Sequence, residues 1–235
     1  MKIQILQYLE GAKKATGLAV VIDVFRAFSV GCYVMHNGAN ELIAVGDVET
    51  AFLLKNNNPD FILIGERNER KVDGFDYGNS PTHIEKVNFS GKTVVQTTSA
   101  GTQGLVQARQ AERIITGSLV NADAIITYIK SQSPQNVSLI AMGHSGRDPA
   151  DEDLFCAEYI NAGLTGKFIE AGPRIRKLKA GSGRRFFDPE NHAHSPHTDF
   201  ELCTRIGYFN FILKADIVSG DSVTLRKVSM KEVPD

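Results

Sequence analysis

Carboxylate side chains that could hold a metal ion follow apolar runs of the chain. Asp23 ends an apolar run at residues 18–23, Glu66 follows another at 61–64, and Asp76 lies in the loop beyond it. Carboxylate oxygens are the hard ligands that Mg²⁺ prefers, and Mg²⁺ typically takes only one or two of them besides water and substrate oxygens. We therefore expect Asp23, Glu66 or Asp76 to bind Mg²⁺. The acidic run 151–153 could contribute as well, or it could be an ordinary first turn of a helix.

Hydroxyl groups and glycines occur together in two turns that each precede a predicted helix. A helix start with free N–H groups favours an oxyanion, so these turns could bind phosphate. Arg26 could add a bidentate clamp. Each turn alone is more often a helix cap than a ligand site. The candidate phosphate-binding residues in the two turns are Thr97, Thr98, Gly101, Thr102, Ser118 and Asn121.

A long polar loop covers residues 65–81. Pro81 suits the first turn of a helix, which Asn79 or Ser80 could cap. Long loops in compact domains are often functional, although a polar connection without a function is the alternative. We expect Arg67, Asn79 and Ser80 to contact a substrate.

The elements that position these residues alternate between strands and helices as far as about residue 165. Such alternation indicates an α/β protein with a three-layer α/β/α arrangement around a mainly parallel or mixed sheet. The predicted strands cover residues 18–23, 41–45, 61–64, 92–97, 113–116 and 137–142, and the predicted helices 26–35, 48–56, 102–111, 119–131 and 152–162. Because ligands of open parallel sheets bind beyond the carboxyl ends of the strands, the candidate residues should share one edge. His144, which follows the strand at 137–142, belongs to the same set.

The remainder of the chain is less regular. Residues 172–187 carry six Lys or Arg and no acid, and residues 188–198 add three histidines, so we expect a long surface excursion. A charge run of this kind is usually a solvated face, with substrate binding as the alternative. Residues 200–213 could be helical, and 217–218 with 223–228 could form a closing strand pair. We expect one domain over 1–235, with a regular core at 1–165 and basic and closing elements at 166–235.

Composition excludes several classes of function. The 235 residues, 42% of them hydrophobic, can bury a substantial core, and 26 Lys and Arg against 27 Asp and Glu give a net charge of -1. No overall basic field exists to bind nucleic acid or an anionic membrane, and no stretch of about 18 apolar residues is present. The three cysteines lack a CxxC pair, which favours reduced, buried thiols. We expect a cytoplasmic protein.

Phosphate-binding loops of the P-loop type, dinucleotide turns and the nucleophile elbow are absent from the sequence. Asp23 also lacks a second aspartate two positions later, where Phe25 stands, which disfavours an aspartyl-phosphate mechanism. Hydrolysis by metal-activated water is the preferred mechanism.

Several motifs in order along the chain resemble the 2-phosphosulfolactate phosphatase family. These motifs lie at residues 23–27, 65–67, 74–81, 97–102, 117–122 and 152–154. The resemblance implies a fold peculiar to that family and a Mg²⁺-dependent phosphatase that cleaves 2-phospho-3-sulfolactate to 3-sulfolactate and phosphate, a step of coenzyme M synthesis. It also implies that the chain can form a homodimer.

One position departs from the family pattern. Ala100 stands where the family usually has asparagine before the glycine, which puts recognition of the substrate's sulfonate or carboxylate in question. In our hypothesis Asp23, Arg26 and Asp153 are catalytic, Asp153 prepares water for attack, and His144 protonates the leaving group. Two alternatives stay open: a phosphatase for another small phosphorylated acid, and a non-catalytic anion-binding or regulatory protein.

Overall fold

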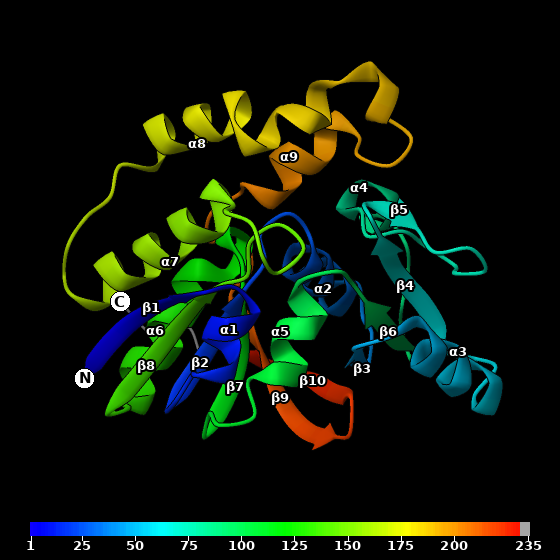
Figure 1. Cartoon of the computed structure of the whole chain (residues 1–235), viewed down its shortest axis with the longest axis horizontal. Helices are drawn as coiled ribbons and strands as arrows, with labels where there is room; N and C mark the ends of the chain where they lie inside the picture. The colour runs from blue at the N-terminus through cyan, green and yellow to red at the C-terminus, as the bar shows by residue number, and fades with distance from the viewer. Residues whose placement is uncertain (231–235) are drawn as a thin grey trace.

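The computed structural model describes residues 1–230, which form a ten-stranded mixed sheet with helices on both faces (Figure 1). This confirms the predicted three-layer α/β/α class. Along the sheet the strands run in the order β1 (Lys2–Gln7), β8 (Asn136–Ala141), β2 (Leu18–Ile22), β7 (Arg113–Gly117), β9 (Phe211–Ser219), β10 (Ser222–Ser229), β3 (Glu41–Val45), β6 (Thr93–Thr97), β4 (Ile62–Arg67) and β5 (Arg70–Lys71).

Two parallel sets of strands make up most of the sheet. β1, β8, β2 and β7 pair in parallel on one side, and β3, β6 and β4 pair in parallel on the other. The C-terminal hairpin of β9 and β10 lies between them and pairs antiparallel with β7 and with β3. The predicted closing strand pair is therefore confirmed, and it occupies the middle of the sheet.

Helices cover both faces of the sheet. They are α1 (Tyr8–Lys13), α2 (Ala27–His36), α3 (Val48–Asn57), α4 (Pro81–Ile84), α5 (Gly101–Gln107), α6 (Ala122–Gln132) and α7 (Asp151–Leu164). All five residues of β2 are buried because neighbouring positions face opposite layers. Val21 packs in a cluster with α1 and α5, whereas Val20 packs in a cluster with α6 and α7.

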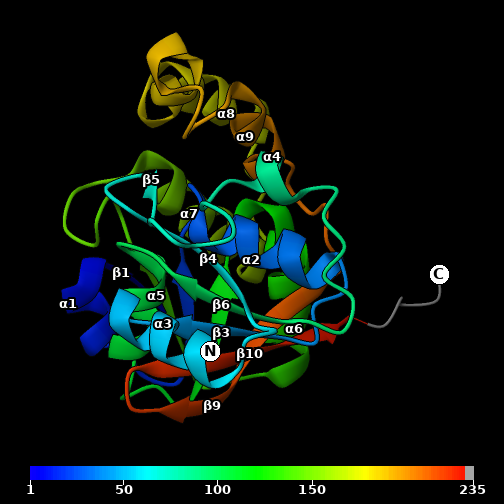
Figure 2. The same cartoon turned by 90° about the vertical axis from the view of Figure 1, so that its right-hand side faces the viewer.

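Residues 171–203, which include the basic run, form a helical arch above the strand ends, where we expected an irregular surface excursion. Figures 1 and 2 show α8 (Ala171–Ala180) and α9 (His197–Cys203) crossing over the core. The 3-10 helices η2 (Ser182–Phe187) and η3 (Pro189–Asn191) connect them. Leu178 and Phe186 are buried against the core, and these apolar anchors within the charge run make the arch an ordered part of the fold.

The helix predicted at 200–213 is correct only in its first part. α9 ends at Cys203, and Phe211 begins β9, because its side chain and that of Leu213 pack into the sheet's core. Over residues 1–230, none of the helices has the length and apolar character needed to cross a membrane. All three cysteines are buried free thiols.

Candidate active site

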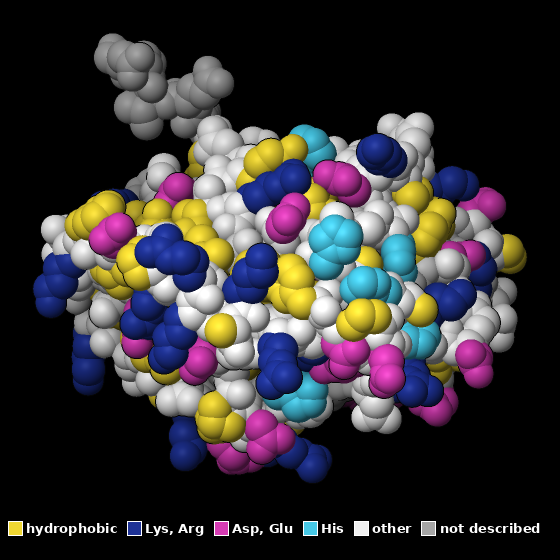
Figure 3. Space-filling model, turned by 90° about the horizontal axis from the view of Figure 1, so that it is seen from above, with side chains coloured by type: hydrophobic (Ala, Val, Ile, Leu, Met, Phe, Trp, Pro, Cys, Tyr) yellow, Lys and Arg dark blue, Asp and Glu magenta, His cyan; other side chains and the backbone are white. Residues whose placement is uncertain are grey.

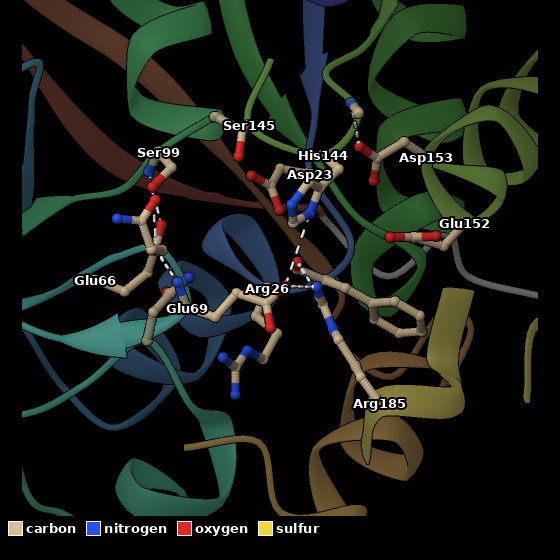
Figure 4. Close-up of a pocket in the computed structure, with 15 residues that line it drawn as sticks. Asp23, Arg26, Glu66, Glu69, Ser99, His144, Ser145, Glu152, Asp153 and Arg185 are labelled. Atoms are coloured by element: carbon tan, nitrogen blue, oxygen red, sulfur yellow. Dashed lines mark hydrogen bonds and ion pairs between the residues drawn. The ribbon is translucent and has the colours of Figure 1, made fainter. Parts of the chain in front are cut away.

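Residues that follow β2, β4, β6 and β8 line one small cavity of about 50 Å³ (Figure 4). Helix α7 and the arch complete its wall. The residues lining the cavity are Asp23, Phe25, Arg26, Glu66, Asn68, Glu69, Asn79, Ser99, Ala100, Gly143, His144, Ser145, Glu152, Asp153 and Arg185.

The twist of the sheet brings these strand ends together. Three successive antiparallel pairings, from β7 through β9 and β10 to β3, give the two parallel sets opposite local directions. In a flat sheet their carboxyl ends would lie at opposite edges. Neighbouring strands are rotated by roughly 20–25°, so the six pairings from β2 to β4 accumulate a rotation on the order of 120–150°. That rotation turns both sets of ends toward one cavity.

Asp153 and Asp23 hold the loops after β2 and β8 around the cavity. Asp153 accepts hydrogen bonds from the backbone N–H of Val24 at 2.8 Å and of Gly143 at 2.9 Å. Asp23 accepts one from the backbone N–H of Ala27 at 3.0 Å. Both aspartates are almost completely buried.

Burial among like charges favours the protonated form of these acids. Burial raises the pKa of Asp23 to about 7; the hydrogen bond from Ala27 opposes the rise and the charge of Glu66 adds to it. Burial also raises the pKa of Asp153 well above its ordinary value, with the charge of Asp23 as the next cause. The pKa of Glu152 is raised by burial in the same way. Asp23 can therefore accept or donate a proton near neutral pH.

Glu66 connects the turn after β4 to the turn after β6. Its carboxylate accepts hydrogen bonds from the backbone N–H groups of Ser99 at 2.7 Å and Glu69 at 2.8 Å, and from the Ser99 hydroxyl at 3.1 Å. Figure 4 shows Glu66, Glu69 and Ser99 on one side of the cavity and Glu152 and Asp153 on the other, with Asp23 between them.

Arg26 is fixed by a buried aspartate from α9. Its Nη1 lies 2.6 Å from Oδ2 of Asp199, and it also donates to the carbonyl oxygen of His194 at 2.7 Å. Asp199 accepts further hydrogen bonds from the hydroxyl of Ser80 and from the N–H and hydroxyl of Thr82. Sequence reasoning missed Asp199, which lies 173 residues from its partner and in no motif.

Arg185 is the residue of the basic segment that reaches the cavity. It forms an ion pair with Glu69 and donates to the carbonyl oxygen of Phe25 at 3.1 Å. The same Glu69 carboxylate lies 3.7 Å from Nδ1 of His144. The basic run, which we expected to be a solvated face, therefore supplies the Arg185 guanidinium to the site. This guanidinium lies over the buried ring of Phe186.

In each of the two predicted phosphate-binding turns, the hydroxyl groups form hydrogen bonds with other groups of the protein. The Thr98 N–H donates to the Thr102 hydroxyl and the Thr102 N–H to the Thr98 hydroxyl, at 2.9 and 3.2 Å. Ser118 and Asn121 form a reciprocal capping box, and the Ser118 hydroxyl lies 2.7 Å from that of Ser29. These four residues cap helices and lie outside the cavity lining. Ser99 and Ala100 of the first turn reach the cavity.

Gly101 also lies outside the lining, directly against Asp23. A Cβ at this position would lie 2.8 Å from Oδ2 of Asp23 and 2.7 Å from Cβ of Ala27. Only glycine allows α5 to begin so close to that carboxylate.

Arg67, Thr97, Ser80 and Asp76 have structural partners instead of lining the cavity. Arg67 donates to the Thr97 hydroxyl at 2.7 Å and to the carbonyl oxygen of Glu66. Ser80 donates to Asp199. Asp76 accepts from the backbone N–H of Leu63 at 2.8 Å and lies 3.7 Å from Nζ of Lys55. The structure thus separates Asp76 from Asp23 and Glu66. Asn79 and His144, by contrast, line the cavity.

The cavity has more carboxylates than cations. Arg26 forms an ion pair with Asp199 and Arg185 forms one with Glu69, whereas Asp23, Glu66, Glu152 and Asp153 form no ion pair with any described residue. The charge of Arg185 offsets those of Asp23 and Glu152 only in part. Oε2 of Glu152 is buried and accepts no hydrogen bond from any described residue.

The strand ends of an α/β sheet that enclose acids and two arginines in a small cavity fit an enzyme that acts on a small charged ligand. Comparison with known sequences identifies the family. A model of the family described as 2-phosphosulpholactate phosphatase matches residues 5–216. The chain therefore belongs to the 2-phosphosulpholactate phosphatase family, whose members are phosphoric monoester hydrolases.

Similar curated proteins cover most of the chain. A protein of Bacillus subtilis named "probable 2-phosphosulfolactate phosphatase" is 29% identical over 97% of this chain and 99% of its own length. A protein of Thermotoga petrophila with the same name is 33% identical over 83% of this chain and 87% of its own. One of Caldicellulosiruptor saccharolyticus, also so named, is 40% identical over 67% of this chain and 64% of its own. The family resemblance stated from the sequence motifs is confirmed.

Proposed function

We propose that this chain is a Mg²⁺-dependent phosphatase that hydrolyses 2-phospho-3-sulfolactate to 3-sulfolactate and phosphate. Family membership supports the substrate. The observation that carries the proposal is the cavity itself, in which Asp23, Glu66, Glu152 and Asp153 surround a space of about 50 Å³. In a host that makes coenzyme M, the reaction would serve the synthesis of that cofactor.

The donor set of the cavity fits Mg²⁺. Carboxylates repel a phosphate dianion unless a cation intervenes, and Arg26 and Arg185, each already in an ion pair, offset these four charges only in part. Within residues 1–230, no three His, Cys, Asp or Glu side chains converge into a protein cage for a metal. Mg²⁺ does not need one, because it keeps several waters and binds one or two carboxylates. Asp23 and Glu66 remain the proposed ligands, and the unpartnered oxygen of Glu152 replaces Asp76 as the third candidate.

The bound cation would supply the positive charge that admits the phosphoryl group and stabilises its transition state. Arg26 and Arg185 would donate N–H groups to the phosphoryl oxygens. Asp153, fixed by two backbone N–H groups, would in its ionised form orient the attacking water and take its proton. As the water oxygen bonds to phosphorus, the bond to the substrate's C2 oxygen breaks. His144, about half exposed at the edge of the cavity, would give that oxygen a proton.

Phosphate release from 2-phospho-3-sulfolactate, with and without Mg²⁺, tests the proposal beside phosphoglycolate and phospholactate. Mg²⁺-dependent preference for the sulfonate is the expected result. Preference for another member of the panel would move the function to a different phosphorylated acid. Ala100, which lines the cavity in place of the family's asparagine, is the observation that favours this second candidate. Metal binding without any turnover would refute the phosphatase and favour an anion-binding protein.

A further inference from the structure

A second cavity of about 450 Å³ adjoins the first and shares Glu69 and Asn79 with it. It lies between the strand β5, the loop leading into α4, and the arch. The residues lining it are Glu69, Lys71, Asp76, Tyr77, Gly78, Asn79, Ser80, His83, Ala193 and His194. None of the steps proposed above uses this space.

The first cavity is too small to hold a whole substrate. A water molecule occupies roughly 10–15 Å³ of such a cavity, so about 50 Å³ holds only a few atoms, about as many as a phosphoryl group has. Most of the organic part of a longer phosphoester must therefore lie outside it. The second cavity is the adjoining space within the described residues that is bounded by the same two side chains.

The direction of the reaction points to the same space. In phosphoryl transfer the attacking and leaving oxygens lie on opposite sides of the phosphorus. Asp153 lies on one side of the first cavity and Glu69 on the other (Figure 4). A water held by Asp153 would therefore expel the leaving group toward Glu69, where the second cavity begins.

The lining of the second cavity suits an acid with an apolar body. Its two carboxylates are already balanced, Glu69 by Arg185 and Asp76 by Lys55. Lys71 donates to the carbonyl oxygen of Phe75 at 2.8 Å and has two further N–H groups to give.

Apolar surface and histidines complete the lining. Tyr77, Gly78 and Ala193 supply the apolar part, with His83 and His194 exposed nearby. Seen from above, histidines gather on one part of this face of the molecule (Figure 3). An acidic end of the leaving group would meet Lys71 beyond this apolar surface.

We propose that this second cavity is the leaving-group subsite, and that it accepts hydroxy-acid phosphates with organic groups longer than three carbons. The proposal rests on the phosphatase function proposed above. Because the cavity is about nine times larger than the phosphoryl site, it leaves room beyond a lactate-sized group. The acidic end of the leaving group would contact Lys71.

The variant Gly78→Leu tests the proposal by filling the cavity. Gly78 has no left-handed backbone conformation, and a Cβ there would first meet Cβ of Lys71 at 3.4 Å, an ordinary contact. Gly172→Leu on α8 is the matched control, since a Cβ there meets only the flexible end of Arg176, also at 3.4 Å, and Gly172 lines neither cavity.

Phosphoglycolate, phospholactate and phosphorylated 2-hydroxyhexanoate form the assay series. Gly78→Leu should lower kcat/KM for the six-carbon ester at least about tenfold and change kcat/KM for phosphoglycolate less than twofold. Gly172→Leu should have the kcat/KM values of the wild type. Lys71→Met should raise KM roughly two- to fivefold for the acids but leave KM unchanged for an alkyl phosphate that carries no carboxylate. An unchanged ratio of long to short substrates in Gly78→Leu would overturn the subsite.

A binding experiment distinguishes failure of the subsite from failure of the phosphatase function. If the wild type hydrolyses none of the esters with Mg²⁺, the proposed function fails. Calorimetric titration with the corresponding phosphonates then decides the subsite alone. Affinity that rises with chain length in the wild type and not in Gly78→Leu supports it, and equal chain-length dependence in both proteins overturns it.

Discussion

Replacing Asp23 by asparagine should remove activity and increase stability. Burial raises the pKa of this carboxyl from 3.8 to about 7, so holding it ionised above that pH costs the folded state about 4 kcal/mol, at about 1.4 kcal/mol per unit. Asparagine has nearly the same shape and can still accept the hydrogen bond from Ala27. Its buried amide donors offset part of the gain, which leaves a net increase of about 2–3 kcal/mol at pH 8.

The pH dependence of this gain identifies its cause. The folded pKa lies above the unfolded one, so between pH 3.8 and about 7 the folded wild type binds more protons than the unfolded chain. Wild-type stability relative to Asp23→Asn therefore falls as the pH rises through this window. The variant's advantage should be small near pH 4 and complete by pH 8.

Urea denaturation of both proteins at pH 4, 6 and 8 in metal-free buffer measures the difference, and phosphate release with Mg²⁺ measures activity. Turnover of the variant should fall by about 10²–10⁴-fold. A stability difference that does not change with pH, or a wild type more stable than the variant at pH 8, would refute the electrostatic argument. Full Mg²⁺-dependent activity of the variant would remove Asp23 from the mechanism.

Three further predictions concern the arginines and the departure from the family pattern. Arg26→Met should destabilise the fold by about 3–5 kcal/mol because it leaves Asp199 buried without its partner. Adding Asp199→Leu should restore part of the lost free energy of unfolding, measured by urea denaturation. Purely additive effects in the double variant would contradict the pairing. Arg185→Gln should raise KM for the phosphoester about tenfold with little change in melting temperature, since its ion pair is partly exposed; an unchanged KM would remove it from substrate binding. Ala100→Asn should increase the kcat/KM ratio of 2-phospho-3-sulfolactate to phospholactate, and an unchanged ratio would show that this position does not contact the acid group.

The sequence by itself determined most of the elements as far as about residue 165 and several of the acids that line the cavity. Strands that are apolar on both faces must be covered by helices on both sides, which is why the α/β class could be read from runs such as β2. Asp23, Glu66 and Asp153 could be identified because each stands where a predicted element begins or ends. Both properties depend on residues that are close together in the chain, so short sequence patterns can predict them.

The tertiary structure decided which polar groups face the cavity. Thr98, Thr102, Ser118 and Asn121 are suited equally to binding an anion and to capping a helix, and only the folded chain shows that they bond to one another. No local pattern indicated that Asp76 would pair with Lys55 instead of joining Asp23.

Long-range contacts supplied the remaining parts of the site. Arg185 reaches the Phe25 carbonyl across 160 residues, and Asp199 reaches Arg26 across 173. The strand order was equally hidden, since the C-terminal hairpin enters the middle of the sheet. We expected the candidate residues to share one sheet edge, but those that line the cavity meet there for a different reason. The sheet is mixed, and its accumulated twist, a property of all its strands together, brings the ends of the two parallel sets to one cavity.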